Sequence, residues 1–197
     1  MRRTTIATFV LVLLALAGCT TTTTDDTTTD PTSALPNDLL HQPGLAARAM
    51  TAIEHAVGAS PAQTSEVDVY AEYLDVEAQD PNNAEHIDDY EWRDGEVGPS
   101  SPVQLSGPQE EIDASLFPTS AVPWKRLAAI VRDAEQAALH NTPLRIEEPR
   151  AQYVIAERST SSADDGRVLL RIYINGPRRS GYVETTATGE IRTVNVS

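Results

Sequence analysis

The sequence predicts an α+β protein made of two tandem units, each with one helix packed on an antiparallel β-meander. Three observations lead to this class. Two segments carry apolar residues at the 3.6-residue spacing of an amphipathic helix. After each helix, apolar residues recur at every second position, as in strands with one buried face, and turn residues separate these strands. A helix can then cover the apolar face of the sheet.

The predicted helices span residues 43–58 and 123–140. Pro43 suits the first turn of the first helix, where a backbone N–H is not needed, and Gly58 suits its end. Each helix has one apolar stripe that a sheet can cover. The stripes consist of Leu45, Ala49, Ile53, Ala56 and Val57 in the first helix and of Leu127, Ile130, Val131, Ala134 and Ala138 in the second.

The first alternating segment, residues 66–78, contains an irregularity. Its apolar residues change from odd to even positions at Tyr73–Leu74. A β-bulge at this point would keep the apolar residues on both sides of it facing the core. We therefore expect one bulged strand, followed by a turn or loop at 80–83.

The remaining strands follow from the same alternation and from the turn residues between them. They are expected at 87–93, from Glu96 onward, and at 151–158, 167–175, 181–187 and 190–196, with turns or loops at Asp94–Gly95, 161–166, 176–180 and Thr188–Gly189. Pro99 and Pro102 restrict the strand from Glu96 to a sheet edge, because proline cannot donate to a neighbouring strand.

These segments divide the chain into five parts. They are a signal peptide at 1–18, a threonine-rich disordered tether at 19–42, a first helix-plus-sheet unit at 43–108, a linker at 109–122 and a second unit at 123–197. The prolines of residues 99–122 favour a connection between the units. Whether the two units share one sheet stays open at this point.

The first 19 residues predict export and lipid anchoring. Arg2 and Arg3 precede a short apolar stretch at 6–17, as in a secretory signal. The sequence Leu16-Ala17-Gly18-Cys19 resembles the lipobox of bacterial lipoproteins, and Cys19 is the only cysteine. The resemblance implies cleavage before Cys19, a diacylglycerol on its sulfur, and anchoring to the extracytoplasmic face of the cell membrane. The alternative is an ordinary secretory signal with an incidental cysteine.

The segment after Cys19 has the composition of a spacer. Residues 20–29 consist of eight threonines and two aspartates, which cannot bury an apolar face. We expect a disordered tether that holds the folded part away from the membrane. Threonine-rich segments are also substrates of O-glycosylation, which the sequence does not decide.

The charge of the chain argues against nucleic acid as a partner. The net charge is −14, and it falls to −16 when residues 1–18 are removed. Residues 43–108 hold 13 acidic and two basic residues, whereas residues 109–197 hold 12 acidic and 11 basic residues. Either the two halves attract each other, or the uneven charge forms a polarised surface that orients a charged partner.

Two segments at the ends of the predicted units resemble each other and a known family. Residues 90–97 align with residues 182–191, and both end in a turn that contains Gly-Glu followed by Val or Ile. A helix followed by an antiparallel meander with a Thr-Gly-Glu-Ile turn resembles the PepSY domain, although Thr186 replaces the usual acidic residue. The chain as a whole resembles lipoproteins of actinobacteria, and the tandem units also resemble the β-lactamase inhibitor proteins. These resemblances imply a module without catalytic residues that binds or restrains other proteins.

The sequence contains few converging groups for catalysis or metal binding. The four histidines, His41, His55, His86 and His140, are scattered and are expected to be surface residues. The densest possible ligand group, residues 86–91, would point to both faces of a strand. No catalytic serine, phosphate-loop or zinc-protease motif occurs. We therefore expect neither enzymatic activity nor a cofactor or metal.

The expected function is a non-catalytic protein-binding or inhibitory module of the cell envelope. A small-ligand or lipid carrier and an envelope enzyme are the alternatives. The candidate residues for an envelope protein partner are Glu66, Asp68, Glu72, Tyr70, Tyr90 and Trp92, which suit a basic partner, and Arg171, Arg178 and Arg179, which suit carboxylates or phosphates. Two competing interpretations remain. Tyr90 and Trp92 share a strand face that core packing also explains, and the arginines also fit a solvated face that pairs with Glu157 and Glu184.

Overall fold

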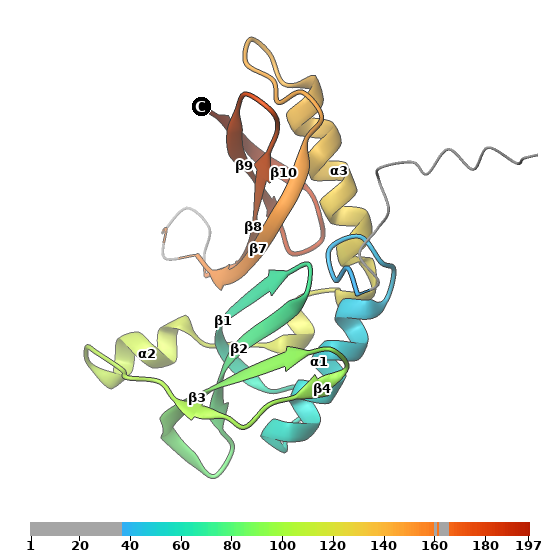
Figure 1. The fold of residues 1–197 in the computed structure, drawn as a ribbon. Helices are drawn as coiled ribbons and strands as arrows, with labels where there is room; N and C mark the ends of the chain where they lie inside the picture. Colours follow the sequence, from blue (N-terminus) through green and yellow to red (C-terminus); the bar gives the residue numbers. More distant parts are fainter. Residues whose placement is uncertain (1–36, 160, 162–165) are drawn as a thin grey trace, which may run out of the picture. The chain divides into compact units, whose positions relative to one another are not determined.

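Figure 1 shows the computed structural model of the chain, which describes residues 37–159, 161 and 166–197. The predicted signal peptide, the lipidation site Cys19 and the threonine-rich run lie outside the described residues, as does most of the predicted loop at 161–166. Within the part that is described, no helix is long and apolar enough to cross a membrane.

The fold is α+β, with an antiparallel sheet and the two long helices packed on one of its faces. The helices are α1 (Leu45–Val57), α2 (Gln109–Ser115) and α3 (Leu127–His140), with short 3₁₀ turns η1 (Thr119–Ala121) and η2 (Trp124–Arg126). The strands are β1 (Gln63–Tyr70), β2 (Tyr73–Asp80), β3 (Asn83–Arg93), β4 (Glu96–Val97), β5 (Ser101–Pro102), β6 (Phe117–Pro118), β7 (Arg150–Arg158), β8 (Val168–Asn175), β9 (Ser180–Thr186) and β10 (Ile191–Val196).

Both long helices follow the predicted apolar stripes. The α1 helix buries Leu45, Ala49 and Ile53 and ends at Gly58, whose φ of 81° is the left-handed conformation that glycine adopts at low cost. The α3 helix starts later than predicted, because the 3₁₀ turn η2 occupies its first residues. The predicted positions of both helices are therefore confirmed to within a few residues.

Across the described residues the main strands form one continuous sheet in the order β10-β9-β8-β7-β1-β2-β3-β4. Strands β5 and β6 pair with β3 and β1 beside this path. The junction is the antiparallel pair β1–β7, in which Val67 lies opposite Ala156 and Tyr70 lies opposite Tyr153. The question that the sequence left open is thus answered, since the N-terminal and C-terminal halves share one sheet.

The prediction of a β-bulge at Tyr73–Leu74 is wrong. Residues 66–78 belong to two strands, and the chain reverses between them at Ala71 and Glu72. In this hairpin Val69 lies opposite Leu74 and both side chains enter the core. The shift in alternation arises because the chain turns back, not because one strand is bulged.

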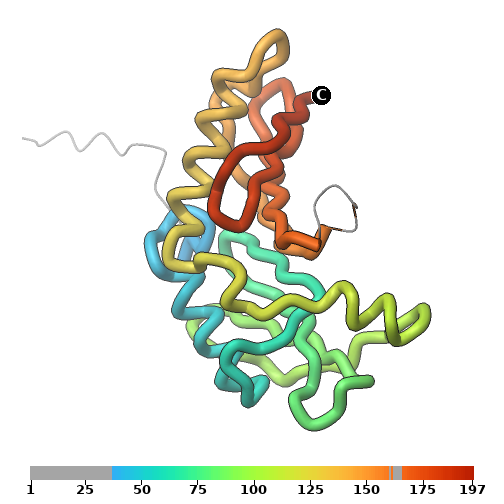
Figure 2. Tube along the Cα trace, turned by 180° about the vertical axis from the view of Figure 1, so that it is seen from behind, coloured from blue at the N-terminus to red at the C-terminus, as the bar shows by residue number. Residues whose placement is uncertain are grey.

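Helices α1 and α3 cover the same face of the sheet, as the two opposite views of Figures 1 and 2 show. Buried residues of both helices and of the strands belong to a single apolar cluster. On the strand side this cluster includes Val67, Val69, Leu74, Val76, Val154, Ala156, Leu170, Ile172, Ile174 and Val183. Because strand side chains alternate, their neighbours point to the other face, which we call the open face.

The folded part starts before residue 43, which corrects the predicted end of the tether. Leu39 and Leu40 are fully buried in the core, and the N–H of Leu39 donates to the carbonyl oxygen of Ala71. Burying two leucines is favourable enough to order the short segment that carries them.

The predicted linker at 109–122 carries secondary structure. It contains α2, β6 and η1, and Phe117 in β6 is fully buried beside β1. The N–H of Thr119 also donates to the carbonyl oxygen of Ala62. This segment is therefore packed against the sheet and does not act as a free connection.

Candidate functional site

Five tyrosines, one from each of five neighbouring strands, form a row across the open face. The chain has six tyrosines. The cross-strand register places Tyr182, Tyr173, Tyr153 and Tyr70 opposite one another in turn. Tyr73 follows Tyr70 across the tight β1–β2 turn. We call these five residues the tyrosine row.

The rings of the tyrosine row stack on one another. Their centroids lie 4.3 Å apart for Tyr73 and Tyr70, 5.2 Å for Tyr70 and Tyr153, and 4.3 Å for Tyr153 and Tyr173. Tyr182 continues the row with a tilted ring at 5.9 Å from Tyr173. Because the ring faces cover each other, the row presents ring edges and hydroxyl groups outward.

An arginine lies at each end of the tyrosine row. The guanidinium of Arg93 lies 4.2 Å from the centroid of the Tyr73 ring, and that of Arg171 lies 5.5 Å from the Tyr182 ring. Such cation–π contacts stabilise the terminal rings. The row is therefore a half-buried surface whose side chains are held in place before any partner binds.

A group of carboxylates lies beside the tyrosine row on the same face. It consists of Glu66, Asp68, Asp75, Glu77 and Asp89, which line a hollow of about 200 Å³. We call it the acidic cluster. Asp68 and Asp75 stand two residues from the row along β1 and β2, which corresponds to about 7 Å.

Burial, followed by mutual repulsion, raises pKa values in the acidic cluster. Burial and the nearby charges of Asp68, Glu77 and Glu157 raise the pKa of Glu66 to about 7. Burial and the carboxylates of Asp89, Glu91 and Asp68 raise the pKa of Asp75 to about 6.

The pKa values of Asp68 and Asp89 are raised for the same reasons. One carboxylate oxygen of Asp68 is buried and has no hydrogen-bond partner among the described residues. A cation that enters this hollow would relieve an electrostatic cost that the folded protein bears without it.

The tyrosine row also borders a larger hollow. Its volume is about 570 Å³ and its lining includes Tyr70, Tyr153, Tyr173 and Tyr182. Gln152, Asn175 and Ser180 contribute polar groups to the same lining. The open face thus offers an aromatic groove with hydrogen-bonding groups on one side and carboxylates on the other.

The structure separates the residues that the sequence proposed for a basic partner. Glu66, Asp68 and Tyr70 lie on the open face, as expected. Tyr90 and Trp92 lie opposite Val76 and Leu74 on the helix-covered face, and Trp92 is buried.

Core packing, the competing interpretation, thus explains Tyr90 and Trp92 and removes them from the candidate surface. Glu72 is exposed in the β1–β2 turn, away from the acidic cluster. It lines a different hollow, together with Asp38 and His41.

The three arginines that the sequence analysis proposed for carboxylates or phosphates lie in two separate places. Arg171 lies on the open face, where its guanidinium is 3.4 Å from Glu157 Oε1 and 3.5 Å from Glu184 Oε2. This pairing is the alternative that the sequence had left open. Arg178 and Arg179 are exposed in the turn between β8 and β9.

Sequence reasoning missed most of the tyrosine row and three members of the acidic cluster. The missed residues are Tyr153, Tyr173, Tyr182, Asp75, Glu77 and Asp89. The available signal was the position of each tyrosine at a non-core position of a predicted strand. Their alignment depends on the strand order and register, which the sequence pattern does not specify.

His41 is not the surface residue that the sequence analysis expected. Its imidazole is 13 % exposed and lies 2.9 Å from both Asp38 Oδ2 and Glu135 Oε1. Arg150 also contacts Asp38 at 3.1 Å. These groups form an ion network that fastens the segment before α1 to α3 and β7.

The described residues contain no group of three histidine, cysteine or acidic side chains arranged to hold a metal ion. Comparison of the chain with models of protein families, with curated proteins and with solved structures finds no match. The candidate site therefore rests on the geometry of the open face.

Proposed function

We propose that this protein is a membrane-anchored extracytoplasmic lipoprotein that binds a basic protein partner, without catalysis, through the open face of its sheet. The observation that carries the proposal is the stacked tyrosine row next to a cluster of repelling carboxylates. A lipid on Cys19 would hold the protein at the membrane, and the threonine-rich tether would let the open face reach its partner.

The tyrosine row supports a protein partner because its side chains are already ordered. Tyrosine offers a large contact area and a hydroxyl group with only two rotatable side-chain bonds. Stacking between Tyr70, Tyr153 and Tyr173 restricts these bonds further. The entropy lost on binding is therefore small, which favours affinity.

The acidic cluster supports a partner that carries arginine or lysine. A guanidinium or ammonium group placed between Glu66 and Asp75 would lower their raised pKa values and remove part of their repulsion. Charge attraction would also speed the encounter, and the tyrosines would slow dissociation.

We also propose that the two halves are related as an internal repeat. The order α1-β1-β2-β3-β4 in the first half matches α3-β7-β8-β9-β10 in the second. The sheet order places β1 and β7 side by side and the later strands of each half progressively outward. This arrangement supports the resemblance to tandem PepSY-like units, which superposition of the two halves tests directly.

The binding proposal is tested by comparing capture of envelope proteins by the mature chain and by four variants. Tyr153→Ala/Tyr173→Ala removes the centre of the row, and Glu66→Gln/Asp75→Asn removes two charges of the acidic cluster. Glu110→Gln/Glu111→Gln on exposed α2 removes the same charge elsewhere. Tyr90→Phe removes the hydroxyl group of the tyrosine that lies outside the row. These last two variants are the controls.

We expect a basic protein to be retained by the wild type and by both control variants, and lost from both open-face variants. Its retention should weaken as salt rises, because part of the attraction is between exposed charges. Equal retention by all five chains would contradict the proposal.

A further inference from the structure

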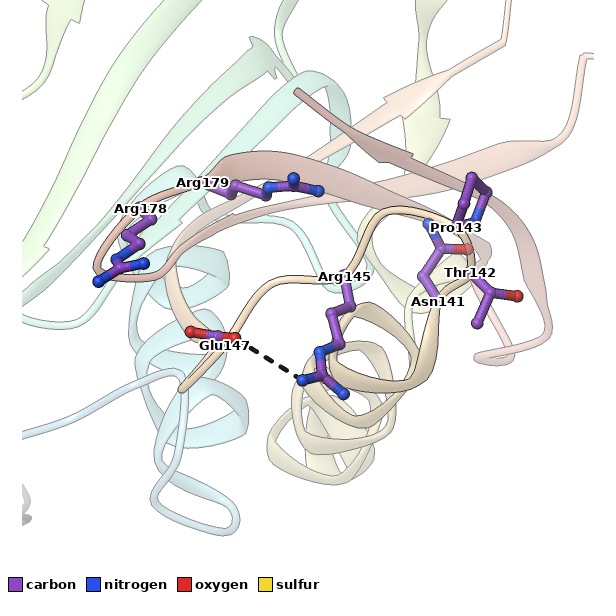
Figure 3. A pocket seen from close by; sticks show the side chains of 7 residues that line it. All are labelled: Asn141, Thr142, Pro143, Arg145, Glu147, Arg178 and Arg179. Carbon is purple, nitrogen blue, oxygen red and sulfur yellow. Dashed lines mark ion pairs between the residues drawn. The ribbon is translucent and has the colours of Figure 1, made fainter.

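A second candidate site lies at the end of the sheet, where the β8–β9 turn meets the loop after α3 (Figure 3). The pocket has a volume of about 410 Å³. Its charged lining residues are Arg178 and Arg179 from the turn and Arg145 and Glu147 from the loop. Asn141 and Thr142 provide neutral polar groups in the same lining.

The two segments that form this pocket are held against each other. A Cβ atom at Gly176 would lie 2.3 Å from the carbonyl oxygen of Glu147, so the close approach requires glycine. The N–H of Gly176 donates to the carbonyl oxygen of Arg179, and the N–H of Ile146 donates to that of Ala138. The backbone around the arginines is thus fixed, while their long side chains remain free to adjust.

The charge balance of the pocket is positive in a strongly acidic protein. Three arginines elsewhere in the described chain, Arg93, Arg150 and Arg171, contact carboxylates. Within the described residues, by contrast, Arg178 and Arg179 form no ion pair with an acidic side chain.

Arg145 contacts Glu147 only at 3.7 Å, and both side chains are more than 60 % exposed (63 % and 62 %). Such an exposed pair contributes little stability and is easily exchanged. All three guanidinium groups are therefore available to a ligand.

We propose that this pocket binds a phosphate group, held by Arg145, Arg178 and Arg179. Three guanidinium groups and one carboxylate give a net charge of two positive units, which matches a phosphate dianion and exceeds what a single carboxylate would neutralise. Guanidinium groups donate paired hydrogen bonds to phosphate oxygens.

A competing explanation assigns the arginines to helix α3. The C-terminal end of a helix carries partial negative charge, which favours nearby cations. On that explanation the arginines would stabilise the fold but would have no affinity for phosphate. The two explanations predict different responses to phosphate and to the loss of Glu147.

The test is a titration of the mature chain, carrying Cys19→Ser, with inorganic phosphate at constant ionic strength, followed by amide chemical shifts and calorimetry. We expect saturable binding that Arg178→Gln/Arg179→Gln weakens by about tenfold or more, since charge-assisted hydrogen bonds are lost. Glu147→Gln should strengthen binding, because it removes the one carboxylate that lines the pocket among the described residues. Arg132→Gln, an exposed position on α3 outside the lining, should have no effect.

Vesicles distinguish the source of the phosphate. Sedimentation with vesicles of phosphatidylcholine, with and without phosphatidic acid, reports whether a lipid headgroup reaches the pocket. Association that requires phosphatidic acid and is lost in Arg178→Gln/Arg179→Gln would identify a headgroup, whereas binding of free phosphate without vesicle association would identify a soluble phosphate ester.

Absence of saturable phosphate binding, or an equal loss in Arg132→Gln, would overturn the proposal. So would an altered melting temperature of the arginine variants with unchanged phosphate affinity, which is the result that the helix explanation predicts.

Discussion

The Nε2 atom of His41 lies 2.9 Å from Glu135 Oε1, in a contact between residues 94 positions apart. The Nδ1 atom of the same ring contacts Asp38, whose side chain is 1 % exposed. Burial by itself lowers the pKa of His41, but hydrogen bonds to Asp38 and Glu135 outweigh this effect and raise the pKa to about 9. His41 is therefore a cation at neutral pH, and it joins the start of the folded part to α3.

The first prediction concerns His41 and pH. Because its pKa is higher in the folded state than in the unfolded state, the stabilisation is complete below about pH 6.5 and is lost as pH rises through about 9. His41→Gln should lower the free energy of unfolding by roughly 2–3 kcal/mol at pH 6 and by much less at pH 10.

Urea unfolding of both chains at pH 6, 8 and 10 measures the effect of His41→Gln. Asp38 and Glu135 are the charged groups that contact the ring, and Arg150 contacts Asp38. A difference between the two chains that stays constant with pH would mean that the imidazole does not titrate in this network.

The second prediction concerns Glu66, whose charged form destabilises the folded state, whereas the charged form of His41 stabilises it. Its folded-state pKa of about 7 exceeds the ordinary value of 4.5, so its charge opposes folding once pH rises through that interval. Glu66→Gln should therefore stabilise the protein by roughly 1 kcal/mol at pH 8 and leave it unchanged near pH 4.5. Unfolding curves at the two pH values measure this, with Glu110→Gln on exposed α2 as the control.

The third prediction concerns the stacking of Tyr70 on Tyr153 across the β1–β7 junction. A double-mutant cycle with Tyr70→Ala and Tyr153→Ala should give a coupling energy of about 0.5–1.5 kcal/mol. Tyr153→Phe keeps the ring and should preserve stability, while weakening any partner that binds the hydroxyl. A coupling energy near zero would indicate that the two rings do not stack in solution.

The fourth prediction locates the end of the tether. Leu39→Ala should lower the free energy of unfolding by about 2–5 kcal/mol, as expected for truncation of a fully buried leucine. A chain that starts at residue 37 should be as stable as the mature chain, whereas one that starts at residue 43 should be clearly less stable. Equal melting temperatures for these two truncated chains would contradict the burial of Leu39 and Leu40.

The fifth prediction concerns anchoring. Cys19→Ala should abolish lipid attachment and move the protein from the membrane fraction to the soluble fraction. Metabolic labelling with a fatty acid, combined with fractionation, measures both effects. A variant that stays in the membrane fraction after high-salt washing would show that another contact holds it there.

The sequence pattern was sufficient for elements whose signals are local. Strands β7 to β10 lie within one residue of their predicted ranges and are separated by turn residues such as Gly189, and α1 ends where Gly58 follows its apolar stripe. The Asp94–Gly95 turn also occurs as predicted, with φ values of 54° and 95°.

The β1–β2 hairpin was missed for a physical reason. Its two turn residues, Ala71 and Glu72, carry neither glycine nor asparagine, so only the shift in alternation marks the reversal. A bulge and a hairpin produce the same shift, and the correct choice depends on which strands pair.

The candidate site could not be predicted from local sequence patterns, because it depends on which strands pair. The acidic residues of 66–77 were recognisable as a charged stretch, but the tyrosine row brings together residues from 70 to 182. It forms only because β1 pairs with β7. His41 was missed for a related reason, since its partner Glu135 is distant in the sequence.

The pairing of β1 with β7 also means that each half of the chain covers a strand edge of the other half. If the chain were divided between α2 and α3, one fragment would expose the edge of β1 and the other the edge of β7. Both strands have alternating apolar residues and free backbone groups on such an edge, which is the type of surface that recruits further strands and leads to aggregation. Proteolysis in this region would therefore yield fragments prone to self-association, and the intact polypeptide avoids this hazard by joining the two edges within one molecule.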